Sequence, residues 1–131
     1  MTRGIRNHNP GNIRHGDKWK GLSETQTDKS FCQFIAPEYG IRAMLRILQN
    51  YDKKYKMNTI RQMISRWVPP NENNTEGYIA YVRKSTGIQD NVVLDTNNVA
   101  IMTKLIKSII HMENGQQPYS DAIIEKAFEL L

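Results

Sequence analysis

One glutamate near the carboxyl end of the longest predicted helix is the residue best suited to acid–base chemistry. Steps of four, three and four residues back from Glu113 reach Ile109, Ile106 and Met102, so the glutamate lies on the apolar stripe of that helix. Apolar surroundings and the partial negative charge at a helix C-terminus both disfavour an ionised carboxyl group. A glutamate that keeps its proton near neutral pH can serve as a general acid. A glutamate at a frayed helix end, turned out to solvent, fits the same position, so the spacing leaves both interpretations open.

Metal and thiol chemistry find little support in the composition. Cys32 is the single cysteine, which excludes an internal disulfide, and it lies in an alternating run typical of a small buried residue. His8, His15 and His111 show no ligand spacing with one another or with Cys32. We therefore expect no metal site and no cofactor.

The charge balance favours an anionic partner. The chain has 18 Lys and Arg residues against 13 Asp and Glu residues, a net charge of +5. Nucleic acid, anionic lipid and bacterial cell wall all fit that charge. The basic residues are dispersed and no recognition motif is visible, so we expect no specific nucleic-acid binding. No run of roughly 18 apolar residues occurs, so we expect no membrane insertion.

Glu113 must be positioned by helices, because apolar residues recur at helical spacing from Pro37 onward. The pattern predicts helices from Pro37 through Tyr51, from Asn58 or Thr59 to Trp67, from a Thr75 cap to Thr86, from Asp95 or Thr96 to about Glu113, and from a Ser120 cap to Leu131. The helix that ends near Glu113 is apolar around most of its circumference, which indicates a central position among the others.

The first 36 residues lack helical periodicity. "NPGN" is a turn, in which Gly11 and Asn12 tolerate positive φ. Residues 13–22 and 30–36 read as two short strands joined by the loop 23–29. The predicted fold class is therefore α+β and mostly α-helical, with residues 1–131 forming one domain that carries a small N-terminal β-hairpin lobe.

Two parts of the sequence, the end of the Glu113 helix and the N-terminal segment, carry a family resemblance. "IIHMENG" resembles the end of the catalytic helix in lytic transglycosylases and related lysozyme-like muramidases, and "NHNPGNIRHGDKWKG" with "FCQFIAPEYGIRAMLRIL" resembles their hairpin and following helix. In those families the glutamate helix precedes the hairpin, whereas here it follows. The resemblance therefore implies a circularly permuted lysozyme-like domain, which compact domains with adjacent termini tolerate.

The chain as a whole is also similar to a group of small phage and prophage proteins described as virion structural or lysozyme-like. The shared motifs lie at Arg6 to Arg14, Gly40 to Ala43, Trp67 to Tyr78 and Glu113 to Tyr119. The implied function is cleavage of the peptidoglycan glycan strand, with Glu113 as general acid/base. The implied partners are peptidoglycan glycan strands and other virion proteins.

The resemblance also suggests which residues would meet the sugar. Amide and aromatic side chains near turns suit N-acetyl groups and sugar faces, and the candidates are Asn9, Asn12, Trp67, Asn73, Thr75, Tyr78 and Tyr119. A hydrolase would usually need a second carboxylate, for which Asp17, Glu24, Asp28 and Glu72 are candidates. Each of these residues also fits an ordinary role as a cap, a turn former or a core residue.

Two questions stay open at the level of sequence. A lytic transglycosylase needs one carboxyl group, because the sugar's own hydroxyl attacks, so the sequence does not choose between that reaction and hydrolysis. A non-catalytic virion structural or wall-binding protein would share every packing feature. The N-terminus lacks the apolar stretch of a signal peptide. We therefore expect synthesis in the bacterial host cytoplasm and action in the periplasm or cell wall, as an endolysin, or within the virion.

Overall fold

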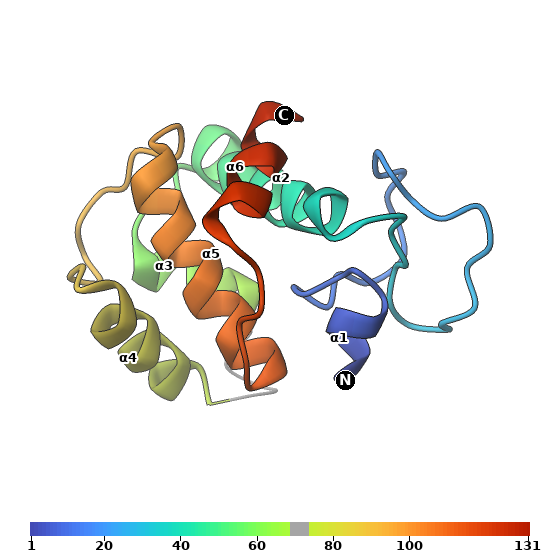
Figure 1. The fold of residues 1–131 in the computed structure, drawn as a ribbon. Coiled ribbons are helices and arrows are strands. Elements are labelled where there is room, and N and C mark those ends of the chain that lie inside the picture. Colours follow the sequence, from blue (N-terminus) through green and yellow to red (C-terminus); the bar gives the residue numbers. More distant parts are fainter. Residues whose placement is uncertain (69–73) are drawn as a thin grey trace.

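The computed structural model describes residues 1–68 and 74–131, and these are mostly helical (Figure 1). The helices are α1 (Arg3–Arg6), α2 (Pro37–Tyr55), α3 (Ile60–Trp67), α4 (Thr75–Thr86), α5 (Val99–Asn114) and α6 (Asp121–Glu129). The five longer helices lie where the apolar periodicity predicts them. The short helix α1 was not predicted, because four residues are too few to show a helical period.

Helix α5 is the central element of the fold, as its apolar circumference predicts. Met102, Ile106 and Ile109, which lead to Glu113 along one stripe, are all fully buried. The helix packs against α1, α2, α4 and α6 (Figure 1). Although α5 is apolar on most sides, no helix within residues 1–68 and 74–131 is long and apolar enough to cross a membrane.

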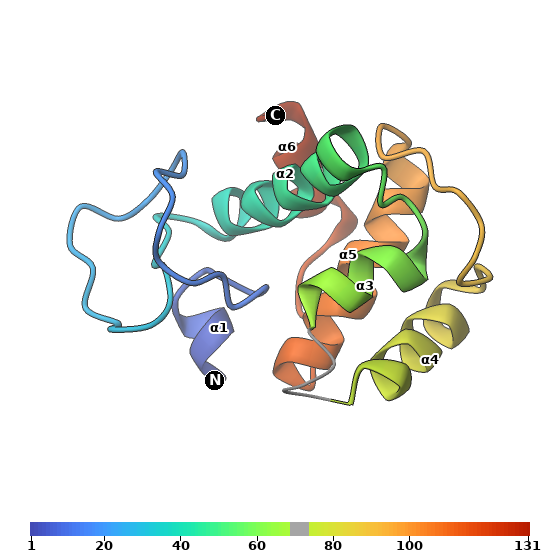
Figure 2. The same ribbon diagram turned by 180° about the vertical axis from the view of Figure 1, so that it is seen from behind.

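Helices α2 and α6 pack together over α5, as both views show (Figures 1 and 2). Pro37 lies at the start of α2, where its missing N–H costs no helical hydrogen bond. Arg42 and Arg46 on α2 donate hydrogen bonds to the carbonyl oxygens of Leu130 and Leu131, at 2.9 and 3.2 Å. These bonds tie the end of the chain to α2.

The helix starts agree with the sequence prediction at two caps and differ at two others. Thr59 caps α3 and Ser120 caps α6, as predicted. Helix α4 is capped by Asn74 rather than Thr75, whose hydroxyl donates instead to the carbonyl oxygen of Val68 at 2.7 Å.

Helix α5 is capped by Asn98, not by Asp95 or Thr96. The Asp95 carboxylate accepts a hydrogen bond from the Asn97 backbone N–H, and the Thr96 hydroxyl donates to Asp52. The predicted caps were wrong here because Asp95 stabilises the preceding turn and Thr96 bonds to α2, so neither side chain is available to cap α5.

The predicted N-terminal β-hairpin is not formed as a pair of strands within the described residues. The two segments meet only at two isolated antiparallel bridges, Arg14 with Phe31 and Leu22 with Phe34. Side chains take over much of the backbone hydrogen bonding: Asp28 accepts from the N–H groups of Ser30 and Phe31. Such local bonds compete with a regular strand ladder, so the lobe is an irregular loop on an α-rich protein.

The two termini lie at different ends of the molecule. The N-terminus lies near the carboxyl end of α5, whereas the C-terminus lies beside α2 at the far end in both views (Figures 1 and 2). A permutation that moved residues 103–131 ahead of residue 1 would have to join these two ends across the molecule.

Candidate active site

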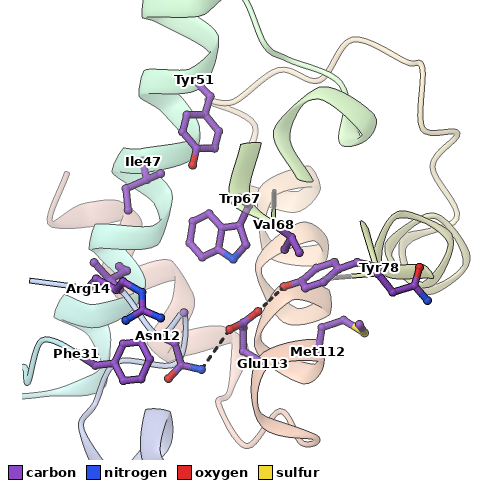
Figure 3. Close-up of a pocket in the computed structure, with 13 residues that line it drawn as sticks. Asn12, Arg14, Phe31, Ile47, Tyr51, Trp67, Val68, Tyr78, Met112 and Glu113 are labelled. Atoms are coloured by element: carbon purple, nitrogen blue, oxygen red, sulfur yellow. Dashed lines mark hydrogen bonds between the residues drawn. The ribbon is translucent and has the colours of Figure 1, made fainter. Parts of the chain in front are cut away.

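A cleft of about 570 Å³ contains Glu113 and brings together segments that are far apart in the sequence (Figure 3). Its lining comes from the N-terminal loop, α2, the end of α3, the start of α4 and the end of α5: Gly11, Asn12, Ile13, Arg14, Phe31, Ile47, Tyr51, Trp67, Val68, Asn74, Tyr78, Met112 and Glu113. Four of the residues predicted for the site, Asn12, Trp67, Tyr78 and Glu113, therefore share one cleft.

The Glu113 carboxylate is held between two donors from different elements. The Asn12 amide Nδ2 donates to Oε1 at 3.2 Å, and the Tyr78 hydroxyl donates to Oε2 at 3.0 Å (Figure 3). Glu113 is half-buried. The sequence predicted an apolar setting for this carboxyl group, but its two oxygens face an amide and a phenol. Each oxygen thus has a fixed direction within the cleft.

Tyr78 remains a neutral donor over the physiological pH range. Its side chain projects from α4 and the residue is 6% exposed. Burial raises the pKa of the Tyr78 phenol far above its ordinary value, and the nearby Glu113 carboxylate raises it further. The hydroxyl therefore stays protonated and can continue to donate a hydrogen bond to Glu113.

The residue after Glu113 fixes the loop that carries Asn12. Asn114 is buried at the end of α5, and its Nδ2 donates to the Pro10 carbonyl oxygen at 2.8 Å. The Thr2 hydroxyl donates to Asn114 Oδ1 at 2.8 Å. Asn12 itself has a φ of 51°, the left-handed conformation that the "NPGN" turn predicts and that asparagine tolerates. In the "Glu-Asn-Gly" sequence, Glu113 thus accepts a hydrogen bond from Asn12, and the next residue, Asn114, holds the loop that carries Asn12.

Trp67 forms a wall of the cleft between Glu113 and α2 (Figure 3). A Cβ added to Gly11 would lie 3.1 Å from the Trp67 ring, so the Gly11 backbone packs directly against the indole. Ile47 and Tyr51 extend the apolar lining along α2. An indole beside polar donors suits the face of a sugar ring.

Arg14 and Phe31 also line the cleft and were not predicted from the sequence. The Arg14 guanidinium lies 4.9 Å from the centre of the Phe31 ring. The one sequence signal for Arg14 was its place two residues after the candidate Asn12 in the same motif. No comparable signal pointed to Phe31, which reaches the cleft through the bridge to Arg14.

Three of the residues predicted to bind sugar, Asn9, Thr75 and Tyr119, lie outside the cleft lining and are buried in the fold. Asn9 is fully buried and its amide bonds the backbone of Ile13 and Cys32. Thr75 is buried against the carbonyl oxygen of Val68. Tyr119 is also buried, and burial raises the pKa of its phenol to about 12.

The structure places none of the described second-carboxylate candidates in the cleft lining. Asp28 forms a salt bridge with Arg3 at 2.6 Å and organises the loop around it. Asp17 and Glu24 are exposed, and Asp17 lines a separate hollow. Glu72 and Asn73 lie outside the described residues.

The described part of the cleft holds a single carboxylate, Glu113. Among the described residues, no group of three or more His, Cys, Asp and Glu side chains is arranged to hold a metal ion. What the described side chains offer is one carboxyl group with two donors, an indole wall and a guanidinium.

Comparison with known proteins connects the chain to a bacteriophage. It is 43% identical over 132 residues to Protein P5 of Pseudoalteromonas phage PM2, an alignment that spans 98% of this chain and 81% of the relative. The chain belongs to the family of this phage protein. The phage relationship that the motifs predict is thereby confirmed. No family model matches the chain. The relative's name states no activity, so the function must be argued from the cleft.

Proposed function

We propose that this protein cleaves the glycan strand of peptidoglycan, with Glu113 as the general acid/base. The observation that carries the proposal is the position of the Glu113 carboxylate, half-buried in a cleft and held by Asn12 and Tyr78. A general acid needs such a fixed geometry toward the atom that it protonates. The proposal includes a lysozyme-like arrangement of the helices around this cleft.

The carboxylate that the described lining contains, Glu113, is sufficient for a lytic transglycosylase. Hydrolysis with inversion or retention usually employs two carboxyl groups across the scissile bond. In the transglycosylase reaction, Glu113 gives its proton to the glycosidic oxygen as the bond from that oxygen to the anomeric carbon breaks. The C6 hydroxyl oxygen of the same sugar then bonds to the anomeric carbon, and its proton passes to Glu113. The products are a free hydroxyl end and an anhydro-muramic end.

The neighbouring side chains have distinct roles in this proposal. Asn12 and Tyr78 position the carboxyl group, and their donors stabilise the carboxylate that forms when its proton has left. Trp67 supplies the flat apolar surface for a sugar ring. The enzyme would act for a phage on the cell wall, either in the periplasm of an infected cell or from the virion.

The test is digestion of purified sacculi with the wild-type protein and with Glu113→Gln, followed by mass analysis of the released muropeptides. We expect anhydro-muramic ends from the wild type and a rate at least about 100-fold lower from the variant, because general acid catalysis contributes at least this factor. Reducing ends would identify a hydrolase instead. A folded wild type that binds sacculi but releases nothing would overturn the proposal and leave a non-catalytic wall-binding or virion structural protein.

A further inference from the structure

A second hollow of about 420 Å³ adjoins the candidate active site and has a different chemical character. It is lined by Asp17, Lys18, Trp19, Ile47, Asn50, Tyr51, Lys54, Tyr55 and Arg66. Ile47 and Tyr51 line both hollows, so the two meet along α2. In Figure 3, Tyr51 and Glu113 lie at opposite ends of the cleft, with Ile47 and Trp67 between them. The second hollow therefore extends the cleft beyond Tyr51.

One face of α2 supplies most of this second hollow. Residues 47, 50, 51, 54 and 55 are spaced as neighbours on a helix surface, and all five line it. Arg66, from α3, stacks over two of them: its guanidinium lies 4.2 Å from the centre of the Tyr55 ring and 5.4 Å from that of Tyr51. The stacked rings hold the Arg66 charge at the surface in a defined place.

The charges of the second hollow favour an anionic ligand. Lys18, Lys54 and Arg66 face one carboxylate, Asp17, so the lining has three positive charges against one negative. Within the described residues none of the three cations forms a salt bridge. The Asn50 amide adds a side chain that can pair with a peptide bond.

We infer that this hollow binds the carboxylate-bearing peptide that branches from a muramic acid residue of the glycan strand, one or more sugars away from the scissile bond. The inference rests on the proposed function, because it takes peptidoglycan as the ligand. A strand that runs from Glu113 past Trp67 to Tyr51 would carry its side peptide into the basic hollow. The protein would then distinguish peptide-bearing glycan from bare glycan.

The test compares binding to intact sacculi with binding to glycan strands whose peptides have been removed by an amidase, both in the Glu113→Gln background so that the ligand survives. We expect intact material to bind about five-fold more tightly, the size of effect that a few exposed ion pairs produce. The double variant Lys54→Gln/Arg66→Gln should lose this preference and leave binding to bare glycan unchanged. Raising the salt concentration should reduce the preference as well.

The matched control is Lys84→Gln/Lys126→Gln, which removes two exposed positive charges from α4 and α6. It should retain the preference for intact material. Equal binding to both materials by the parent protein, or an equal loss for both in the Lys54/Arg66 variant, would overturn the inference. Release of muropeptides is measured separately on the wild type. A preference for peptide-bearing glycan without any release of muropeptides would support the inference and overturn the cleavage proposal. Release of muropeptides together with equal binding to both materials would support the cleavage proposal and overturn the inference.

Discussion

The Tyr78 hydroxyl donates a hydrogen bond to Glu113 Oε2 at 3.0 Å, joining the start of α4 to the end of α5 across 35 residues of sequence. The bond is one of two that orient the carboxylate, and it comes from a phenol that is almost completely buried. Since the packing of α4 on α5 sets the geometry of this bond, the orientation of the Glu113 carboxylate depends on a helix–helix contact as well as on its own helix.

Tyr78→Phe should lower the rate of glycan cleavage about ten-fold and the free energy of unfolding by about 1.5 kcal/mol, because a hydrogen bond to a charged group is lost while the ring is kept. The rate is measured by muropeptide release and the stability by urea denaturation. Tyr81→Phe is the matched control, since Tyr81 stacks on His111 and its hydroxyl makes no hydrogen bond within the described residues. An unchanged cleavage rate in Tyr78→Phe would show that the phenol has no part in orienting Glu113.

Substitutions at Asn12 separate the amide's role from that of its backbone conformation. Asn12→Gly and Asn12→Ala both remove the donor to Glu113 and should slow cleavage to a similar extent. Only alanine should also lose about 1 kcal/mol of stability, because a Cβ without a compensating polar group is unfavourable at a φ of 51°. Parallel rate assays and thermal melts test this. If Asn12→Gly were as active as the wild type, the Asn12 amide would have no part in orienting Glu113.

The salt bridge between Arg3 and Asp28 predicts a loss of stability in acid. The Arg3 guanidinium, together with the N–H groups of Phe31 and Ser30 and the Asn7 amide, holds the pKa of the Asp28 carboxyl well below its usual range. A carboxyl group with a lowered folded-state pKa stabilises the protein above its unfolded pKa of about 3.9, and that contribution disappears as the pH falls through the folded value.

Asp28→Asn should therefore be less stable than the wild type at neutral pH, and the difference should shrink steadily below about pH 4. Urea denaturation at several pH values measures both proteins. Glu24→Gln, which removes an exposed carboxyl group of the same loop and keeps the Arg3–Asp28 salt bridge, serves as the comparison and should lose stability in acid as the wild type does. A constant difference between wild type and Asp28→Asn from neutral pH down to about pH 2 would mean that the charge of Asp28 is not what stabilises the loop.

The sequence predicted the helices well because their signals are local. Apolar spacing, Pro37 and the Thr59 and Ser120 caps each act within a few residues. The N-terminal lobe was predicted less well, since Asp28 bonds the backbone in a way that only the folded loop reveals.

The candidate site was predicted in part for the same reason. Glu113 could be placed from the helical repeat, but which asparagine of "NHNPGN" would face it could not. Asn9 turns inward to the backbone of Cys32, whereas Asn12 turns toward Glu113. That choice depends on how the turn is held against α5, which the tertiary bond from Asn114 to Pro10 determines.

Asn114 should act as a positioning residue for the site. Asn114→Ala leaves the buried Pro10 carbonyl oxygen without its 2.8 Å donor, which should cost about 2 kcal/mol of stability. It also releases the loop that carries Asn12, so cleavage should slow in the folded variant. Because Asn114 acts through Asn12, the double variant Asn12→Gly/Asn114→Ala should be no slower than Asn12→Gly, a non-additive result that general destabilisation would not produce.

Ser108→Ala provides the control for the stability loss. Ser108 is buried in α5 and donates a hydrogen bond to Ser85, and it does not line the cleft. The variant should be less stable and yet cleave at the wild-type rate under conditions in which it is folded. If the double variant Asn12→Gly/Asn114→Ala slows by the product of the two single-variant factors, Asn114 influences Glu113 by a route that does not involve the Asn12 amide.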